Sequence, residues 1–385
     1  MSDRREVPFG RPVITDADRQ AVMQVLEGHI LTHGPQCKAF EAEFAEFLGP
    51  GAHAVTVSSC MAALHLSCLH FGFGPGDDVL VAAQTHVATA HAVEWTGARP
   101  VFIDCDPATG NVTAEIVERA ITPKTKALML VHFVGIPCNM PAIMAVAGRH
   151  GIKVIEDCAI ALGSRYDGTH VGLFGDAACF SFYPVKHMTS AEGGMFVSRH
   201  KAVVDNVTRV RAFGVDRTYA ERTLPGLYDV PMLGLNYRMS ELQAALGRSQ
   251  LGRLHDTLKV RAANFATLRD ALAGAGGIEV IDACDPKAAN SHYCLTIRPG
   301  PRWRGRRNDF VRALNAEGIG TSVHYPQPVP RMTYYQKKYG YDASKFTGAE
   351  SISDGTLALP VAPHLSADDV QYIARVVARV AKGES

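Results

Sequence analysis

The sequence predicts an α/β protein in which a mostly parallel sheet is sandwiched between helices, with a smaller α+β unit at the C-terminal end. Between His53 and Ser198, short β-prone runs alternate with helical segments. The runs are almost continuously apolar, which is typical of parallel strands buried on both faces. Their alternation with helices indicates successive βαβ units. After Ser198 the alternation stops, and from Gly277 strands and helices follow in a different order.

The elements of the first part can be assigned by residue number. Helices are expected at Thr15–Leu26 and Cys37–Leu48, before the first strand. The β-prone runs are AVTVSS, DDVLVAA, PVFIDCD, KALMLVHFVG and IKVIEDC, and the helices between them are expected at 60–70, 86–96, 113–120 and 140–150. Two further strands, Ala177–Tyr183 and Gly193–Ser198, are joined by a polar turn that contains Lys186.

The C-terminal part begins with helical sequence at 201–213 and an irregular loop. A long helix starts near Ser240 and extends or kinks towards Leu272. The elements expected after Gly277 are strand IEVIDA, strand SHYCLTIRP, helix 308–317, strand GTSVHYP, a proline-rich loop and helix 366–382, which Ser366 caps. We therefore predict a large domain at 1–250 and a small C-terminal domain at 251–385, with a soft boundary within 245–275.

The composition argues against several classes of protein. The chain has 39 Lys and Arg against 38 Asp and Glu, without the basic excess of a nucleic-acid-binding protein or a polybasic membrane anchor. Its start lacks the apolar core of a secretory signal, and its longest apolar stretch, around Ala127–Pro137, is too short to span a bilayer. The 9 cysteines form no CxxC pair, which fits a reducing cytoplasm, and the 16 histidines show no ligand spacing that predicts a metal site.

Polar residues follow predicted strands at the carboxyl edge of the sheet, where ligands bind in open α/β folds. Ser58, Ser59 and Cys60 end one strand and open a helix, whose free N–H groups suit a phosphate. A serine that merely caps the helix explains these residues as well. Glu156 and Asp157 end the strand IKVIED. A carboxylate there either pairs with a protonated ring nitrogen or caps a helix.

Lys186 completes a pattern that points to pyridoxal phosphate (PLP). Burial between two strands disfavours the ammonium form and leaves a nucleophilic amine, as a Schiff base requires. On that stretch alone, a surface lysine in a β-connection is the simpler interpretation. The order along the chain of a phosphate cradle, an acid for a ring nitrogen and a Schiff-base lysine matches what PLP requires.

The residues also resemble a known family along nearly the whole chain. The most specific stretches are FSFYPVKHMTSAEGG and LNYRMSELQAALG. Further matches are LTHGPQCKAFEAEFAEFLG, VSSCMAALHLSCLHFGFGPGDDVLV, THVATAHAVEWTGARPVFIDCD, VIEDCAIALGSRYDG and GIGTSVHYPQP. They resemble the sugar aminotransferases of the DegT/DnrJ/EryC1/StrS family, which are fold-type I PLP-dependent enzymes. The resemblance implies that fold, PLP as cofactor and a homodimer with shared active sites.

The resemblance implies a role for each matching residue. Lys186 would form the Schiff base and shuttle the proton, and Asp157 would hold the proton of the pyridine ring. Ser181 and the backbone at Cys60 and Met61 would bind the phosphate.

Four further positions take roles from the same resemblance. His86 stands where the family places an aromatic ring that stacks on the cofactor. Asn236 would reach the phosphate bound by the neighbouring subunit. His324 and Tyr325 fall in the loop that approaches the sugar.

Three positions depart from the family pattern. Ile160 replaces a Gln or His near the phenolic oxygen of the cofactor and cannot supply its hydrogen bond. Met61 replaces a threonine, which removes a hydroxyl from the phosphate cradle. Pro330 stands in place of a histidine after the HYP loop. These departures bear on cofactor tuning and substrate choice.

The implied function is transfer of an amino group from L-glutamate or glutamine to a keto-sugar. The expected acceptor is a nucleotide-linked 4-keto- or 3-keto-(deoxy)sugar, in the biosynthesis of an amino sugar for a surface polysaccharide or a secondary metabolite. One alternative is the sugar 3-dehydratase branch of the family, which has histidine where Lys186 stands. Another is an aminotransferase that acts on a keto-sugar acid or keto-cyclitol without a nucleotide. A regulatory or structural role would leave Lys186 and Asp157 unexplained.

Overall fold

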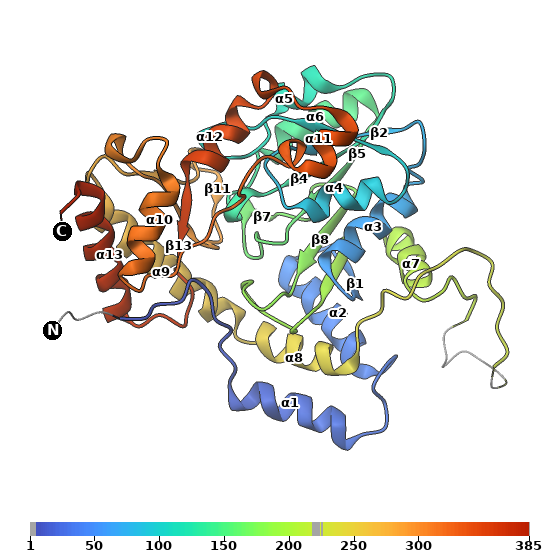
Figure 1. Ribbon diagram of the computed structural model, residues 1–385. Coiled ribbons are helices and arrows are strands. Elements are labelled where there is room, and N and C mark those ends of the chain that lie inside the picture. The colour runs from blue at the N-terminus through green and yellow to red at the C-terminus, as the bar shows by residue number, and fades with distance from the viewer. Residues whose placement is uncertain (1–4, 218–223, 225, 385) are drawn as a thin grey trace.

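A seven-stranded sheet forms the centre of the molecule, with strand order β1-β9-β8-β5-β4-β2-β3. The computed structural model describes residues 5–217, 224 and 226–384. The strands are β1 (His53–Val57), β2 (Asp78–Ala82), β3 (Arg99–Ile103), β4 (Thr125–Val131), β5 (Lys153–Asp157), β8 (Ala177–Ser181) and β9 (Gly194–Ser198). Strand β9 is antiparallel to β1 and β8, and the pairs from β8 through β5, β4 and β2 to β3 are parallel. The predicted mostly parallel sheet is confirmed (Figure 1).

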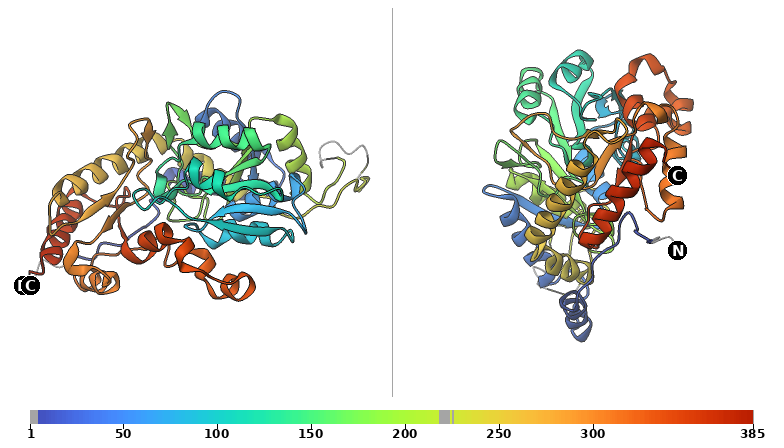
Figure 2. Two further views of the ribbon diagram at one scale, coloured as in Figure 1. Left: turned by 90° about the horizontal axis from the view of Figure 1, so that it is seen from above. Right: turned by 90° about the vertical axis from the view of Figure 1, so that its left-hand side faces the viewer.

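Helices cover both faces of this sheet because alternate residues of each strand point to opposite sides. Val79 and Val81 of β2 join one buried cluster with the helices of one face, and Leu80 and Ala82 join another with those of the opposite face. The first face carries α3 (Cys60–His70), α4 (Val87–Glu94) and α7 (Lys201–Val210). The second carries α2 (Pro35–Leu48), α5 (Ala114–Ala120), α6 (Met140–His150) and α8 (Glu241–Leu251). The layers are visible in Figure 2.

The predicted long helix breaks at Gly252 and Arg253, between α8 and α9 (Leu254–Leu272). Helix α9 leads into a small sheet of β10 (Glu279–Ile281), β12 (Leu295–Arg298) and β13 (Leu357–Leu359), covered by α10 (Arg307–Ala316) and α13 (Ala367–Lys382). Ser366 caps α13 as predicted, in a capping box with Asp369. The other elements are β6 (Arg165–Tyr166), β7 (Thr169–His170), β11 (Ala288–Ala289), α11 (Thr333–Tyr339), α12 (Thr347–Gly355), and 3-10 turns at Phe133–Gly135, Pro301–Trp303, Val329–Arg331 and Ala343–Lys345.

The predicted strand at GTSVHYP is wrong. This segment is irregular and makes an isolated bridge from Ser322 to Ala358, while β13 supplies the third strand of the small sheet. The stretch read as a proline-rich loop also contains helices α11 and α12. These helices pack against the large sheet, as Tyr335 does edge-on against Phe102 with ring centroids 5.1 Å apart. Local sequence could not reveal them because their stability comes from that packing.

The N-terminal segment runs along the small sheet before it reaches the large one. Val7 bridges to Ile319, and Arg5 pairs with Asp369. Segments from both ends of the sequence therefore cross between the two sheets, and the boundary near residue 250 stays a prediction. Within the described residues, every helix is too short or too polar to cross a membrane.

A buried ion pair fixes α1 (Asp16–Glu27) to the break between α8 and α9. Asp18 has no exposed surface and accepts hydrogen bonds from both terminal nitrogens of Arg253, at 2.7 and 2.6 Å. Ser249 and Gln250 also donate to it, at 2.6 and 3.0 Å. Burial alone would raise the pKa of Asp18, but the bonds from Arg253 and Ser249 hold it well below its ordinary value.

We expect Asp18→Ala to lower the free energy of unfolding by about 1.5–3 kcal/mol at pH 7, because it removes the charged acceptor of the hydrogen bonds from Arg253, Ser249 and Gln250. Since the pKa is depressed in the folded state, the stabilisation is complete above the ordinary aspartate pKa and is lost as the pH falls through the folded value. Urea unfolding of both proteins between pH 3 and pH 8 measures the difference. The control is Asp16→Ala, on the same helix, because Asp16 forms an exposed pair with Arg19. Equal losses in the two variants would contradict the role of burial.

Candidate active site

Asp157 lies at the carboxyl end of β5 and is 3% exposed. Its carboxylate accepts a hydrogen bond from the hydroxyl of Thr89 at 2.8 Å and another from the N–H of Ala159 at 3.0 Å. The thiol of Cys60 lies 4.0 Å away. Among the described residues, no arginine, lysine or histidine forms an ion pair with this carboxylate. A buried carboxylate that lacks a cationic partner can hold a protonated ring nitrogen.

The start of α3 offers a site for an anion. Ser59 caps the helix by accepting a hydrogen bond from the N–H of Ala62 at 3.1 Å. The N–H groups of Cys60 and Met61 have no acceptor among the described residues, so both remain available. Gly194 of β9 approaches this turn so closely that a Cβ there would lie 2.5 Å from the carbonyl carbon of Ser59.

The same approach brings a third phosphate candidate to the helix start. Ser181 pairs with Gly194 across β8 and β9, and Gly194 pairs with Val57 at the end of β1. The serine therefore lies next to the turn in which α3 begins. Its hydroxyl accepts a long hydrogen bond of 3.4 Å from the N–H of Tyr183.

Lys186 lies in the loop that follows β8. Its N–H donates to the carbonyl of Tyr183 at 2.9 Å, and its amine lies 5.4 Å from the centre of the Tyr293 ring. Burial lowers the pKa of Lys186, although Cys60 and Asp157 oppose the shift. The environment thus favours the neutral, nucleophilic amine that the sequence predicted.

Aromatic side chains form one wall of the site. The rings of His86 and Tyr325 meet edge to face with centroids 5.8 Å apart, and His324 lies 5.4 Å from Tyr293. The Nδ1 of His86 accepts the N–H of Ala88 at 3.2 Å, so the ring proton lies on Nε2. Burial lowers the pKa of His86, and lowers that of His324 to about 3, so both rings are neutral near pH 7.

Tertiary contacts hold the loop at His324 against the large sheet. Gln84 donates to the carbonyl of His324 at 2.9 Å and accepts from the hydroxyl of Ser353 at 2.6 Å. Nδ1 of His324 is buried and has no partner among the described residues. This nitrogen is available to a group that enters the site.

The side chains of two further predicted positions make no hydrogen bond with this group within the part of the chain that the structure describes. Asn236 is exposed on the segment between α7 and α8, and its side chain makes no hydrogen bond within the described residues. Its role toward a neighbouring subunit stays a prediction. Ile160 is 1% exposed and packs in an apolar cluster with Phe133 and Tyr293, so packing alone accounts for its side chain.

Sequence reasoning missed two residues that contact the site. Thr89, which donates to Asp157, lies one turn after His86 on α4, and this spacing could have indicated it. Tyr293 faces Lys186 from just before β12, more than a hundred residues away in the chain, and no local pattern marks it.

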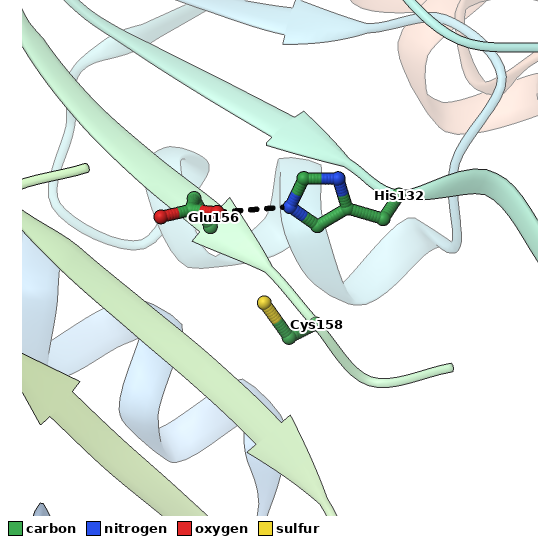
Figure 3. A group of neighbouring side chains, drawn as sticks. All are labelled: His132, Glu156 and Cys158. Carbon is green, nitrogen blue, oxygen red and sulfur yellow. Dashed lines mark hydrogen bonds and ion pairs between the residues drawn. The ribbon is translucent and has the colours of Figure 1, made fainter. Parts of the chain in front are cut away.

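The cluster in Figure 3 offers the donor atoms of a metal site from His132, Glu156 and Cys158. Hydrogen bonds already engage both ring nitrogens of His132 and both carboxylate oxygens of Glu156. Nδ1 of His132 accepts the N–H of Cys138 at 3.1 Å, so Nε2 carries the proton and donates to Glu156 at 3.0 Å. The same carboxylate accepts the N–H groups of Gly172, Phe174 and Gly175. Burial would raise the pKa of Glu156, but the bond from His132 and these N–H groups hold it below its ordinary value. The cluster therefore anchors the end of β5 and does not involve Asp157.

The residues around Asp157 and Lys186 fit PLP. The cofactor needs an acid for its ring nitrogen, donors for its phosphate and an amine for its aldehyde. Within the described residues, Asp157 is buried without a cationic partner and the start of α3 has N–H groups without an acceptor. The amine of Lys186 has a lowered pKa.

Comparison with known proteins agrees with this chemistry. The DegT/DnrJ/EryC1/StrS aminotransferase family matches residues 12–378. The chain is 37% identical to the spore coat polysaccharide biosynthesis protein SpsC of Bacillus subtilis over 382 residues, which cover 98% of this chain and 97% of that protein.

Two solved structures are similar over their whole length. A putative sugar aminotransferase from Streptococcus pneumoniae in its PMP form superposes with a TM-score of 0.92 at 27% identity, covering 98% of this chain and 99% of that one. DesV of S. venezuelae superposes with a TM-score of 0.88 at 32% identity, covering 98% and 100%. The fold-type I prediction is thereby confirmed. The chain belongs to the DegT/DnrJ/EryC1/StrS aminotransferase family and is a PLP-dependent aminotransferase.

Proposed function

We propose that this enzyme transfers the amino group of L-glutamate or glutamine to the carbonyl carbon of a nucleotide-linked keto-sugar, and that it does so in the cytoplasm. The observation that carries the proposal is the amine of Lys186, whose pKa burial lowers. It lies near the buried carboxylate of Asp157, which has no cationic partner among the described residues. A sugar acceptor is supported by the names of the similar proteins, which include a putative sugar aminotransferase and a spore coat polysaccharide biosynthesis protein.

The site residues divide the chemistry between them. When bound, PLP supplies an electron sink that stabilises negative charge on carbon. The amine of Lys186 holds the cofactor and moves a proton between carbon atoms. Asp157, fixed by Thr89 and by the N–H of Ala159, keeps the ring nitrogen protonated. The N–H groups of Cys60 and Met61, with Ser181, would bind the phosphate, and His86 would stack on the ring.

The environment of His187, the residue after Lys186, argues against the dehydratase alternative. That branch needs a histidine in place of Lys186, and His187 is the nearest one in the sequence. However, His187 is 5% exposed, and its Nε2 lies 3.2 Å from the carbonyl of Ser291 as a hydrogen-bond donor. Burial holds the pKa of His187 well below its ordinary value. This ring is therefore engaged elsewhere and leaves Lys186 as the reacting group.

A homodimer with shared sites is part of the proposal. The described residues between α7 and α8 extend away from the body of the molecule (Figure 1). This segment exposes apolar side chains, with Leu233 93% exposed and Leu227 and Val230 about half exposed. Burial of such side chains favours association with a second copy. Asn236, at the base of the segment, would then reach the cofactor phosphate of the partner.

We expect Lys186→Ala to abolish turnover, because the same amine holds the cofactor and carries the proton. In the wild type, reduction with borohydride should fix the cofactor to the peptide that contains Lys186, as mass spectrometry can identify. Lys201→Ala is the control, since Lys201 is an exposed lysine paired with Asp205. Labelling of another lysine would refute the assignment.

We expect Asp157→Asn to retain cofactor but to lose turnover by about a hundredfold or more. An uncompensated buried charge costs about 3–5 kcal/mol, and this cost would appear in the transition state. Single-turnover rates at saturating cofactor measure the loss. If turnover stays near normal, Asp157 merely supports the turn that follows β5.

Asn236 allows the shared site to be tested by complementation. An Asn236→Ala enzyme should retain cofactor less well, and subunit exchange with Lys186→Ala should restore one intact site in each mixed dimer. Activity after exchange is compared with that of each variant alone. A fully active monomer in light scattering, or no recovery after exchange, would exclude the shared site.

A further inference from the structure

Arg261 is a buried cation that has no acidic partner in the part of the chain that the structure describes. It lies on α9, is 3% exposed, and forms no ion pair within the described residues. One terminal nitrogen donates to the carbonyl of Tyr293 at 2.9 Å, and the other donates to the carbonyl of Lys186 at 3.4 Å. Its Nε has no acceptor among the described residues.

Stability alone does not explain this arginine. Removing a charge from water without a counter-charge costs several kcal/mol, and an apolar side chain of similar volume is often equally or more stabilising. Burial accordingly lowers the pKa of Arg261 to about 10. The two carbonyls that it binds are neutral, so their hydrogen bonds offset only part of the desolvation cost of the guanidinium. The contacts of the guanidinium therefore point to a role in positioning.

The two carbonyls belong to the same functional unit. Lys186 lies in the loop after β8 of the large sheet, and Tyr293 lies just before β12 of the small sheet. The ring of Tyr293 faces the amine of Lys186 at 5.4 Å. One planar guanidinium thus binds both the backbone of the lysine and the backbone of the residue that packs over its amine. A planar fork with fixed donor directions suits this task, whereas an ammonium group does not.

We infer that Arg261 is a positioning residue, which ties the lysine loop to Tyr293 and so sets where the amine of Lys186 lies. The inference rests on the proposed role of Lys186 as the reacting group. Displacement of a reacting group by about 1 Å can cost about a hundredfold in rate. Loss of the fork should therefore lower turnover although Arg261 does not touch the reacting atoms.

The test uses the full-length, cofactor-loaded protein and three variants. Arg261→Met removes the fork and keeps the apolar stem, and Arg261→Lys keeps the charge but not the fork. Arg307→Met is the matched control. Arg307 also lies on a helix of the C-terminal part, donates to one carbonyl, that of Thr356 at 3.1 Å, has an unpartnered Nε, and has a pKa lowered by burial.

Amide hydrogen exchange of residues 183–190 measures how often the lysine loop opens, and this measurement does not depend on enzyme activity. We expect exchange in this loop to be faster in both Arg261 variants and unchanged in Arg307→Met. The visible absorbance of the bound cofactor should change in the Arg261 variants only. Their kcat should fall by about 10- to 100-fold while KM for the amino donor stays within about twofold, since positioning affects the reaction rather than binding.

Unchanged exchange and unchanged kcat in Arg261→Met would overturn the inference, and so would equal effects in Arg307→Met. If Arg261→Met does not fold, Arg261→Lys decides by the same measurements. Should the proposed keto-sugar transfer itself fail, exchange and absorbance still report on Arg261, because neither depends on the substrate.

Discussion

The close approach of β9 to the first turn of α3 is the constraint on which the site depends. Gly194 stands between β1 and β8, and any side chain there would collide with the backbone of Ser59 and Cys60. Because the strand carries no Cβ at this point, the helix start lies against the sheet with its N–H groups directed to the carboxyl edge. The same contact brings Ser181 beside that turn. The geometry of the candidate phosphate site thus depends on the packing of Gly194 against the first turn of α3.

Two buried carboxylates at this edge of the sheet have different hydrogen-bond partners. Glu156 and Asp157 are neighbours on β5, and the alternation of the strand sends them to opposite faces. Glu156 receives hydrogen bonds from His132 and from backbone N–H groups, so nothing more is needed to keep it ionised. Asp157 accepts hydrogen bonds from Thr89 and Ala159, lies 4.0 Å from the thiol of Cys60, and has no cationic partner among the described residues. This lack of a cation is what our proposal uses, in which a protonated ring nitrogen would pair with Asp157.

Helix α9 contacts both the N-terminal helix α1 and the loop that contains Lys186. At its start, Arg253 pairs with Asp18 and fixes the N-terminal helix, and two turns later Arg261 reaches the lysine loop and the segment before β12. Among the described residues, the first arginine has an acidic partner and the second has none. The ion pair of Arg253 fits a role in holding two helices together. The guanidinium of Arg261, which lacks a counter-charge among the described residues, fits a role in positioning the groups that it binds. The C-terminal part of the chain therefore contacts Lys186 in two ways. Arg261 of α9 donates a hydrogen bond to its backbone carbonyl, and the ring of Tyr293 lies near its amine.

The sequence alone determined the large sheet and placed Asp157 and Lys186 after the ends of its strands, where both stay candidates for catalysis. Continuous apolar runs marked the parallel strands, and the positions of Asp157 after β5 and Lys186 after β8 followed from strand ends. These are local features, set by periodicity and by residue type. The strand expected at GTSVHYP was wrong, and α11 and α12 were missed, because contacts with distant segments decide the structure there. Only the tertiary structure could bring Tyr293 and Arg261 to Lys186, since a side chain's place across two sheets depends on packing that no neighbouring residue encodes.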